Sequence, residues 1–421
     1  MIHFQRLLAR AATLLIVATT MMCLQCSSDA ATSATTDGEP KVVNIPTDIP
    51  WSERMARSVM KRHPQSCMID SRDVPHWNYT QGLVLSAILD VWEATETPDY
   101  LTYARGYADT MILADGTIHD YDMAKFNIDH IAPGPYLLKL YAAQSEPRLL
   151  TAVETLLYQL EWQPRTTDGG YWHKLRYPWQ MWLDGLFMGE PFLAMYAATF
   201  DKPAHFDHIA EQFFLAEQHT RDAETGLLYH GWDESRIQRW SDPETGCSPH
   251  FWARAIGWFC MGLVDVLEHF PEDHAQHPKL VALLQRTLDA VLEVQDAETA
   301  TWWQVLDLPE REGNYLESTA SCMFSYALLK GANEGWLSPE YGQQGRKSFE
   351  GILEHFIRTD ANGEIHLTEC CSVAGLGGDP YRDGSFEYYI GEPIRDNDPK
   401  GVGPFIKASL EYEKKQFSSK I

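Results

Sequence analysis

One aspartate stands in an unusually apolar and aromatic stretch of the sequence. Asp184 lies near the end of PWQMWLDG, residues 178–185, where two tryptophans precede it. Burial among such side chains disfavours a charged carboxylate, so we expect the pKa of Asp184 to be raised. A carboxylic acid that stays protonated near neutral pH can act as a general acid. The alternative is a helix N-cap, an ordinary role for an aspartate in front of an apolar run.

Further candidate residues gather in long segments that separate apolar runs and at the helix starts that follow them. Arg254 stands between two tryptophans, and a spacing of four places Arg254 and Trp258 on one helix face. A guanidinium beside aromatic rings can bind a carboxylate through two hydrogen bonds, or it can form a purely structural cation–π pair. The candidates for substrate binding are Asp129, His173, Trp182, His230, Trp252, Arg254 and Trp258.

Two of these candidates have ordinary structural explanations as well. Asp129 follows Asn127 and precedes an expected helix, so it fits an N-cap as well as a site residue. Asp129 and Asp184 could also form the acid and base pair of an ordinary glycosidase. His230, taken alone, is typical of a core or loop histidine. The sequence gives no distance between the two carboxylates, so these alternatives stay open.

Helices must position these groups. Apolar residues recur at spacings of three and four from Trp51 onward, which predicts about twelve helices. A proline opens the second helix of five pairs, where its missing N–H costs no hydrogen bond. We expect Pro191 to kink the helix over 182–199. The predicted spans are 51–62, 76–94, 98–113, 130–144, 147–161, 182–199, 203–219, 250–269, 277–296, 315–333, 338–357 and 404–418.

The remaining connections are long and share one pattern, a turn followed by a few strand-like residues. Such turns begin at Asp115, Asp168, Asp222, Asp296 and Asn362. The unit of helix, proline turn, helix and long loop recurs about six times at roughly 50 to 75 residues. An open solenoid would have the same repeat, but the aromatic and charged loop residues favour a shared cup. The sequence therefore predicts an all-α (α/α)6 toroid of six helical hairpins, with short strands in the long loops at the active-site end.

Composition narrows the class of partner. The net charge of the 421 residues is −25 and the pI is about 5.0, which argues against binding to nucleic-acid phosphates. An anionic substrate would need local cations on such a protein. The 14 Trp, 19 Tyr and 17 Phe suit a large core or platforms for sugar rings. Of the eight cysteines, Cys23 and Cys26 lie in the N-terminal segment, and none of the other six has zinc-site spacing, so we expect mostly buried thiols and no metal.

The first residues predict export. Arg6 and Arg10 precede an apolar run over 11–24 that is too short to span a bilayer comfortably. Cys26 follows this run as in a bacterial lipoprotein, although Gln25 departs from the small residue expected there; cleavage near 30–35 is the alternative. We expect a signal peptide over 1–26, a flexible tether over 27–50 and a catalytic domain over 51–421. The location would be the periplasm or the cell surface, with a membrane anchor if Cys26 is lipidated.

Four separated blocks of the sequence resemble one known family. They are MWLDGLFM at 181–188, HGWDE at 230–234, FWARAIGW at 251–258, and DGSFEYY at 383–389 together with NDPKGVGPF at 397–405. From Trp51 to the C-terminus the chain is similar to the unsaturated rhamnogalacturonyl hydrolases, glycoside hydrolase family 105, relatives of the family 88 unsaturated glucuronyl hydrolases. The resemblance implies an (α/α)6 barrel in which Asp184 is the catalytic acid and the seven residues named above line the pocket.

The resemblance also implies an unusual reaction without metal, cofactor or covalent intermediate. The substrate would be an oligosaccharide whose non-reducing end is a Δ4,5-unsaturated uronic acid left by a polysaccharide lyase. Asp184 would protonate C4, water would add at C5, and the resulting hemiketal would open and release the neighbouring sugar. Asp129, if ionised nearby, would raise the pKa of Asp184 further, and Arg254 and His230 would hold the uronate.

Three other functions compete with this one. An unsaturated glucuronyl hydrolase acting on lyase products of ulvan or glycosaminoglycans would share the barrel and the acid. An inverting glycosidase would use Asp129 and Asp184 on a saturated sugar and need no prior lyase. A non-catalytic glycan-binding surface protein would keep only the barrel, and the intact block around Asp184 speaks against it.

Overall fold

The computed structural model describes residues 44–70 and 73–418. The predicted signal peptide with Cys26, and residues 27–43 of the predicted tether, lie outside the described residues. Ile45 is buried, and its N–H donates to the carbonyl oxygen of Asn362 at 2.9 Å. The last residues of the expected tether are therefore attached to the domain.

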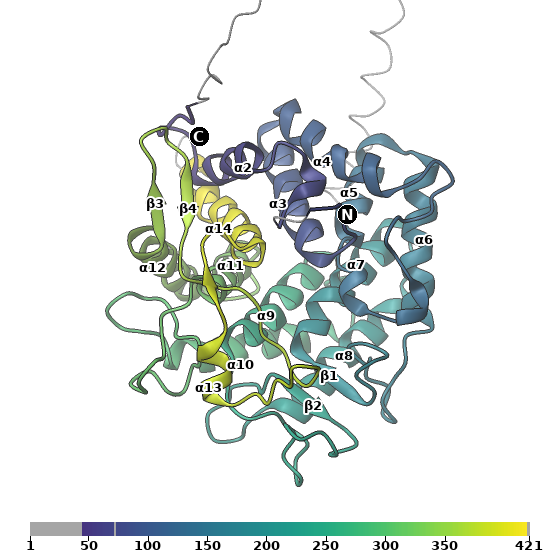
Figure 1. The fold of residues 1–421 in the computed structure, drawn as a ribbon, viewed down its shortest axis with the longest axis vertical. Helices are drawn as coiled ribbons and strands as arrows, with labels where there is room; N and C mark the ends of the chain where they lie inside the picture. Colours follow the sequence, from purple (N-terminus) through teal and green to yellow (C-terminus); the bar gives the residue numbers. More distant parts are fainter. Residues whose placement is uncertain (1–43, 71–72, 419–421) are drawn as a thin grey trace, which may run out of the picture.

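Two concentric layers of helices make up the fold, and within the described residues twelve long helices form six hairpins. The inner helices contact one another in sequence, and α14 contacts α3 to close the ring (Figure 1). The predicted all-α (α/α)6 toroid is confirmed. The inner helices are α3 (Tyr79–Thr95), α5 (Gly134–Gln144), α7 (Leu183–Thr199), α9 (Ala253–Leu267), α11 (Ser318–Asn333) and α14 (Pro399–Ser418). The outer helices are α2 (Trp51–Arg62), α4 (Pro98–Met111), α6 (Pro147–Glu161), α8 (Ala204–Thr220), α10 (His277–Glu293) and α12 (Pro339–His355).

Burial separates the two layers. The inner helices α9 and α11 are buried on nearly every side, as expected of helices enclosed by neighbours. The outer helices bury one face only; in α6 the buried residues recur at spacings of three and four. Pro98, Pro147 and Pro339 each occupy the first position of an outer helix, as the sequence predicts. The other two predicted prolines are one residue off, because Pro203 is the N-cap of α8 and Pro278 is the second residue of α10.

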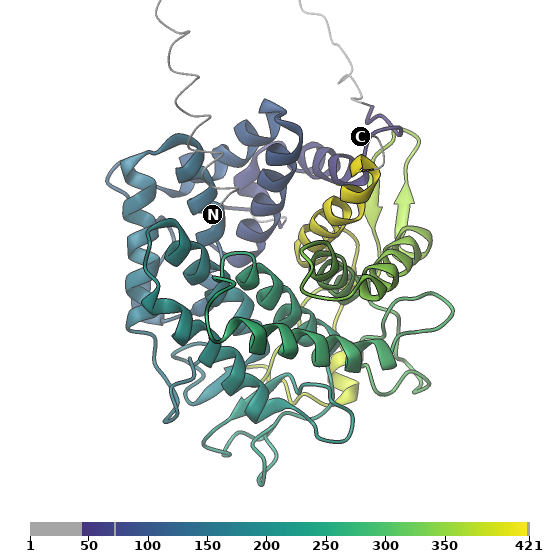
Figure 2. The same cartoon turned by 180° about the vertical axis from the view of Figure 1, so that it is seen from behind.

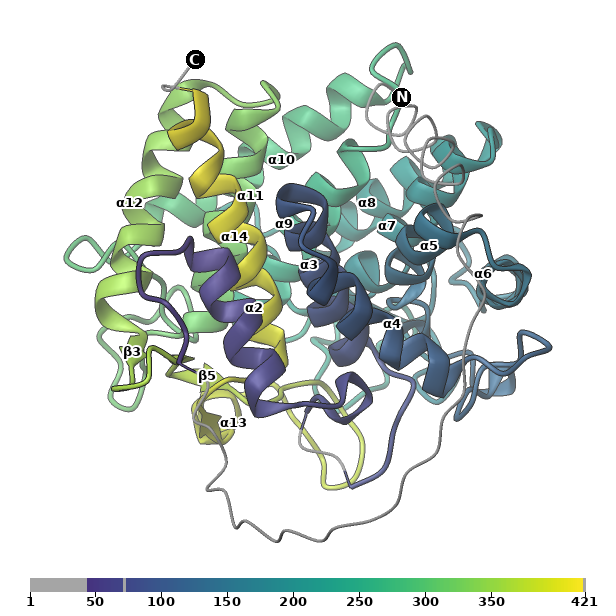
Figure 3. The ribbon, with the colours of Figure 1, turned by 90° about the horizontal axis from the view of Figure 1, so that it is seen from above.

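The sixth hairpin is assembled from the two ends of the chain. The first outer helix, α2, packs against the last inner helix, α14, and Figure 3 shows the two side by side. Glu413 of α14 accepts hydrogen bonds from the backbone N–H and the hydroxyl of Ser52, at 3.1 and 2.6 Å. Because both groups are buried, these bonds join α2 to α14 inside the protein.

Several helices begin at other residues than predicted. The helices α3, α5, α9 and α11 start at residues 79, 134, 253 and 318 rather than at 76, 130, 250 and 315. The residues just before α3, α9 and α11 are N-caps with an extended backbone. Of these caps, the Asn78 side chain accepts from the N–H of Tyr79, and the Glu317 side chain accepts from that of Ala320. Conversely, α14 starts at Pro399 instead of residue 404. Its first turn follows Asp398, whose carbonyl accepts from the N–H of Gly401.

Three small antiparallel sheets lie in the long connections. Strand β1 (Gln180–Trp182) pairs with β2 (Gly231–Asp233), and β5 (Cys370–Cys371) pairs with β6 (Ile394–Arg395). Strands β3 (Ile357–Thr359) and β4 (Ile365–Leu367) form a hairpin beside α12 and α2 (Figure 2). Short helices, absent from the predicted spans, are η2 (Ser66–Met68), η3 (Met123–Lys125), η4 (Ile128–His130) and α13 (Phe386–Gly391).

The predicted turn recurs in the long loops. Backbone bridges pair Ile112 with Ile118, Arg165 with Tyr171, and Arg221 with Leu228 across three of these turns. The turn glycines have positive φ values, +87° at Gly116, +105° at Gly169 and +74° at Gly226. A side chain at these positions would strain the backbone, which explains why the sequence places glycine in each turn.

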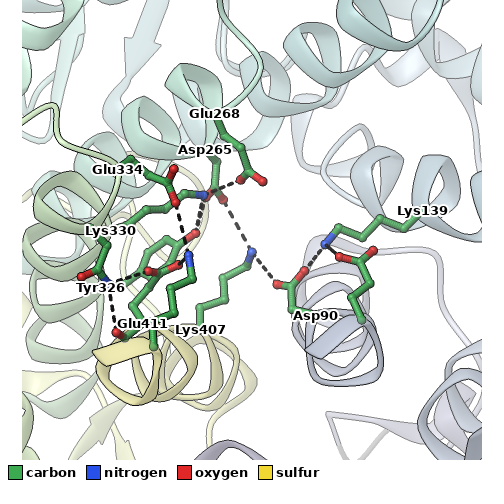
Figure 4. A network of polar contacts seen from close by, with 12 residues as sticks. Asp90, Lys139, Asp265, Glu268, Tyr326, Lys330, Glu334, Lys407 and Glu411 are labelled. Atoms are coloured by element: carbon green, nitrogen blue, oxygen red, sulfur yellow. Dashed lines mark hydrogen bonds and ion pairs between the residues drawn. The ribbon is translucent and has the colours of Figure 1, made fainter. Parts of the chain in front are cut away.

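The end of the ring away from these loops holds a buried charge network (Figure 4). It lines a cavity of about 400 Å³ among the inner helices. Lys330 of α11 contacts Asp265 of α9 and Glu268 directly after α9, at 2.9 and 2.6 Å. Lys407 of α14 contacts Asp90 of α3 at 2.9 Å, and Lys139 of α5 also bonds to Asp90. These ion pairs join five of the six inner helices, namely α3, α5, α9, α11 and α14; Lys407 and Glu411 are the members of the network on α14.

Two smaller features complete the fold. The six cysteines in the described part of the chain are buried free thiols, as predicted for most of them. Among the described helices, none is both long and apolar enough to cross a membrane.

Candidate active site

Asp184 lies in the first turn of α7, directly after β1. The N-cap position belongs to Trp182, whose backbone is extended, so the N-cap interpretation of Asp184 is wrong. Pairing of β1 with β2 brings the His230 segment alongside, and the N–H of Leu183 donates to the carbonyl oxygen of His230 at 3.0 Å. Two residues distant in sequence, Asp184 and His230, thereby become neighbours.

The side chains of Asp184, His230 and Tyr389 form a line. His230 Nε2 lies 3.3 Å from Asp184 Oδ2, and neither atom has a hydrogen-bond partner among the described residues. On the other side of the ring, His230 Nδ1 lies 2.8 Å from the Tyr389 hydroxyl. His230 and Tyr389 are fully buried, whereas the Asp184 side chain is 13% exposed. Asp184 is therefore the member of the line that a ligand can reach.

The predicted direction of the Asp184 pKa shift was wrong. Burial acts to raise the pKa of Asp184, as expected, but the contact with His230 and the nearby His173 and Arg254 lower it by more. The net pKa lies below the ordinary value of an aspartate. Asp184 is consequently ionised at neutral pH in the substrate-free protein.

Asp129 is held in an ion pair beside this line. Its carboxylate binds the Lys174 ammonium and lies 3.3 Å from His173 Nε2. Burial acts to raise the pKa of Asp129, but Lys174 and His173 lower it below its ordinary value. Asn127, not Asp129, caps the short helix η4, by accepting from the N–H of Asp129 at 3.2 Å. The N-cap interpretation of Asp129 is thus wrong, and its charge is offset at least in part by Lys174.

Aromatic rings hold the polar groups in place. Trp182 stacks on His173 with ring centroids 4.5 Å apart and approaches His230 at 5.5 Å. The ring of His230 lies 4.7 Å from that of Trp252, which stacks in turn on Tyr389 at 5.8 Å. Trp182 is only 5% exposed, so it acts as a frame for the two histidines and has little free surface for a sugar. Burial also lowers the pKa of His173 to about 4, which keeps that imidazole neutral.

Arg254 and Trp258 lie beneath these groups. The guanidinium of Arg254 lies 4.8 Å from the Trp252 ring centre and donates to the carbonyl oxygen of Cys371. Arg254 is 1% exposed, so little of its surface is open to a ligand, and it acts mainly through the effect of its charge on neighbouring groups. Trp258 contacts Phe187 at 4.6 Å and the ring of Tyr79 at 6.2 Å. Tyr79 is buried, and the charges of Asp129, Arg254 and Asp184 all act on its hydroxyl.

The structure therefore brings the eight predicted site residues into one continuous cluster at the loop end of the barrel. Two further members of the cluster, Lys174 and Tyr79, belong to the long segments and helix starts from which the candidates come, whereas Tyr389 was not predicted. Lys174 is the neighbour of His173, and its side chain is 13% exposed, so it is the cation nearest the surface of the cluster. Tyr389 belongs to the block DGSFEYY, but nothing in the sequence distinguishes its inward position from that of Tyr388.

Comparison with known proteins agrees with this geometry. The sequence profile of Glycosyl Hydrolase Family 88 matches residues 51–416. The structure of a family 105 glycoside hydrolase from C. acetobutylicum ATCC 824 is similar, with 43% identity, a TM-score of 0.84 and coverage of 87% of this chain and 100% of that chain.

Two further proteins are similar over part of the chain. The 24.9 kDa protein in the picA locus of Rhizobium radiobacter is 42% identical over 230 residues, 53% of this chain and 97% of that protein. The unsaturated 3S-rhamnoglycuronyl hydrolase of Formosa agariphila is 25% identical over 177 residues, 41% of this chain and 46% of that protein. The family profile spans nearly the whole described barrel, and the family 105 enzyme is similar along its full length. The predicted resemblance to family 105 is therefore confirmed. This protein belongs to Glycosyl Hydrolase Family 88 and is a glycoside hydrolase.

Proposed function

We propose that this protein removes a Δ4,5-unsaturated uronic acid from the non-reducing end of lyase-generated rhamnogalacturonan oligosaccharides. The observation that carries the proposal is that the two carboxylates have different partners. Asp184 faces His230, whereas Asp129 is already bound by Lys174. An ordinary inverting glycosidase needs one carboxyl group as acid and a second as free base. The pair with Lys174 makes Asp129 a poor base, which favours a reaction carried by Asp184 alone.

The reaction consists of hydration of the vinyl ether. Protonated Asp184 transfers its proton to C4, and the cation that develops is delocalised over C5 and the ring oxygen. Water adds to C5 and returns one proton to the Asp184 carboxylate, which regenerates the acid. The hemiketal at C5 opens to a ketone by breaking its bond to the ring oxygen. The hemiacetal left at C1 then expels the neighbouring sugar as an alcohol.

The substrate supplies what the substrate-free site lacks. Asp184 is ionised before binding, and a bound uronate adds a negative charge close to it. A like charge raises the pKa of a carboxyl group, so the complex favours the protonated acid that the first step requires. Lys174 at the surface of the cluster and Arg254 beneath it supply the positive charge that attracts the uronate to an acidic protein.

The test follows the ultraviolet absorbance of the conjugated uronate. With an unsaturated rhamnogalacturonan disaccharide, the purified protein should remove this absorbance. The Asp184→Asn variant should abolish turnover and still bind the disaccharide, whereas Asp115→Asn, in an exposed turn, should leave turnover unchanged. Equal turnover by wild type and Asp184→Asn would refute the proposed role of Asp184.

A second candidate is unsaturated glucuronyl hydrolase activity on lyase products of ulvan or glycosaminoglycans. The partial similarity to an unsaturated 3S-rhamnoglycuronyl hydrolase favours it. The same absorbance assay separates the two candidates, because loss of absorbance on those products alone would select the second. Activity on a saturated oligosaccharide without lyase treatment would instead support the inverting glycosidase.

The location proposed for this activity is the periplasm or the cell surface. Arg6, Arg10 and the apolar run over 11–24 support export, and Cys26 supports a lipid anchor. Mass spectrometry of the mature N-terminus distinguishes the two routes. A lipid-modified Cys26 indicates anchoring, and an unmodified start near residues 30–35 indicates release.

A further inference from the structure

The Tyr389 hydroxyl is the group behind His230 that the reaction does not use. Tyr389 lies on α13, which stands at the same end of the barrel as β1 and β2 (Figure 1). Its hydroxyl lies 2.8 Å from His230 Nδ1, and its ring stacks on Trp252. The opposite nitrogen of the same imidazole, Nε2, faces Asp184 Oδ2 at 3.3 Å. The imidazole thus connects a buried hydroxyl to the carboxyl group of the catalytic residue.

The hydroxyl must be the donor of its hydrogen bond. Burial, with the charges of Tyr388 and Asp184, raises the pKa of Tyr389, so the hydroxyl keeps its proton. A buried proton without an acceptor is unfavourable. Among the residues that the structure describes, His230 Nδ1 is the one hydrogen-bond partner of this hydroxyl. Nδ1 is therefore the unprotonated nitrogen of a neutral imidazole, and the ring proton resides on Nε2.

This arrangement opposes a second proton on His230. An imidazolium carries protons on both nitrogens, so its Nδ1–H would turn the Tyr389 hydroxyl into an acceptor. The hydroxyl proton would then have no acceptor among the described side chains around it. A proton that enters the pair of Asp184 and His230 is for this reason better placed on the carboxyl group than on the ring.

We propose that Tyr389 is a positioning residue that holds His230 as the neutral Nε2–H tautomer and so directs the exchangeable proton of the pair to Asp184. The inference rests on the proposed function for the role of Asp184 as acid. Asp184 receives its proton from water, gives it to C4, and recovers one from the water that adds to C5. The Nε2–H of His230 stays in place and faces the carboxylate that exists between these transfers.

The other charged groups around the pair do not take over this role. His173 is neutral, and Arg254 is permanently charged and lowers the pKa of Asp184. Around the Tyr389 hydroxyl, the groups whose charge acts on it are Tyr388, Asp184, Asp383 and Arg382. None of these groups forms a hydrogen bond to His230 Nδ1 in the described structure, so the tautomer depends on Tyr389.

The direct test is the protonation of the imidazole nitrogens in the full protein labelled with 15N-histidine. Long-range 1H–15N spectra distinguish the two tautomers and the imidazolium, and the missing signals of His230→Gln assign His230. We expect Nε2–H with unprotonated Nδ1 in the wild type across the pH range of activity. In Tyr389→Phe the fixed tautomer should be lost, and signals of both neutral tautomers should appear.

Kinetics on the unsaturated disaccharide provide the second arm. Tyr389→Phe should lower kcat by about tenfold to a hundredfold and leave KM nearly unchanged, because the proton is placed on the wrong partner. Tyr388→Phe is the matched control. Tyr388 is the sequence neighbour, its ring lies 5.3 Å from that of Tyr389, and its hydroxyl accepts from the N–H of Gly375. This control should keep both the tautomer and kcat.

Two results would overturn the proposal. Nδ1–H or imidazolium at His230 in the wild type, at the pH of highest activity, contradicts the tautomer and needs no variant to fold. Wild-type kcat in a folded Tyr389→Phe contradicts the role in proton placement. If the protein hydrated no unsaturated uronide, the proposed function would fail, and the spectra alone would decide the tautomer.

Discussion

The carboxyl group of Asp184 has opposite influences acting on it. Burial favours the neutral acid, and the neighbouring His230 favours the carboxylate; the second influence is larger in the substrate-free protein. A general acid with a low pKa is a poor donor at neutral pH. The proposed mechanism therefore requires a change of this pKa within the complex, where the uronate of the proposed substrate would lie near Asp184.

This dependence predicts different pH profiles for the two kinetic constants. The profile of kcat/KM reports groups of the free protein, and that of kcat reports groups of the complex. Asp184 must be protonated to act, and its pKa is low in the free protein. We expect kcat/KM to fall as pH rises through the neutral range, while kcat stays level to a higher pH. Descending limbs at the same pH in both profiles would contradict a shift on binding.

Glu190 presents a second buried carboxyl group, with a consequence for stability instead of catalysis. It is completely buried in α7, and neither carboxyl oxygen has a hydrogen-bond partner among the described residues. Burial raises its pKa to about 8 from an ordinary value of 4.5. Between pH 4.5 and about 8, the folded protein therefore keeps a proton on Glu190 that the unfolded chain has already released.

Stability should accordingly fall as pH rises through this window. The contribution of Glu190 is fully present below pH 4.5 and is lost by about pH 8. The span corresponds to roughly 5 kcal/mol at most. Glu190→Gln removes the titration, so its Tm relative to wild type should increase steadily from pH 5 to pH 8, measured by calorimetry. Glu154→Gln, exposed on α6, should show no such trend, and a constant difference between Glu190→Gln and wild type would contradict the assignment.

Residue type and spacing select eight side chains that the fold brings together, but they do not predict the electrostatics of this cluster. The apolar stretch around Asp184 correctly predicts burial, yet the sign of the pKa shift depends on His230, which reaches Asp184 only through the pairing of β1 with β2. Likewise, the sequence allows Asp129 to act on Asp184, and the fold places Lys174 against it instead. Contacts between distant segments decide both, and no local pattern encodes them.

At the scale of elements, helix periodicity predicted the interior of each helix better than its start. Apolar spacing specifies which face is buried and says little about the first turn, where hydrogen bonds to the loops compete. Trp252 illustrates this, because it bridges to Val305 in an extended conformation and the helix starts only after it. The proline starts were easier to predict, since the fixed φ of proline acts locally.

The charge network at the far end of the ring joins helices that are distant in sequence. Lys330 on α11 is almost completely buried and contacts Asp265 of α9 and the half-exposed Glu268 directly after α9, with the Tyr326 hydroxyl as a further partner. Removal of one member from a buried ion pair leaves the partners uncompensated. The position of each charge is thus important for the packing of its neighbours.

Lys330→Met should therefore destabilise the protein by about 3 to 5 kcal/mol. Urea unfolding followed by circular dichroism measures this loss. The control is Lys414→Met, which removes an exposed lysine that contacts Glu334 and Glu411 on the same end of the barrel. We expect the control to change stability by less than about 1 kcal/mol. Similar losses in both variants would show that burial of the network is unimportant.

At the scale of the whole molecule, the ring differs from an open array of hairpins. In an open array the terminal repeats have one neighbour and open first. Here α14 contacts both α11 and α3, and α2 covers α14, so the terminal helices have neighbours on each side. The sequence repeat predicted six hairpins, but it could not distinguish a closed ring from a solenoid; the contacts of the two ends do.

Hydrogen exchange followed by mass spectrometry tests this closure. Peptides from α2 and from residues 399–413 of α14 should be protected as strongly as peptides from α7, which lies across the ring. Ser52→Ala should weaken protection of α2 and α14 together, because it removes the hydroxyl bond to Glu413. Early exchange of α2 and α14 in the wild type would indicate that the ring opens at its seam.

Assembly of one hairpin from both ends also sets the order in which the barrel can be completed during synthesis. Ser52 and Glu413 are 361 positions apart, so the seam forms only when the last helix has left the ribosome. Until then α3 and α11 each lack the neighbour that covers them. Loop-closure entropy rises slowly with length, so the cost at equilibrium is modest, but the contact is late. A chain that stops before Pro399 presents two apolar helix faces, the kind of surface that chaperones and proteases recognise.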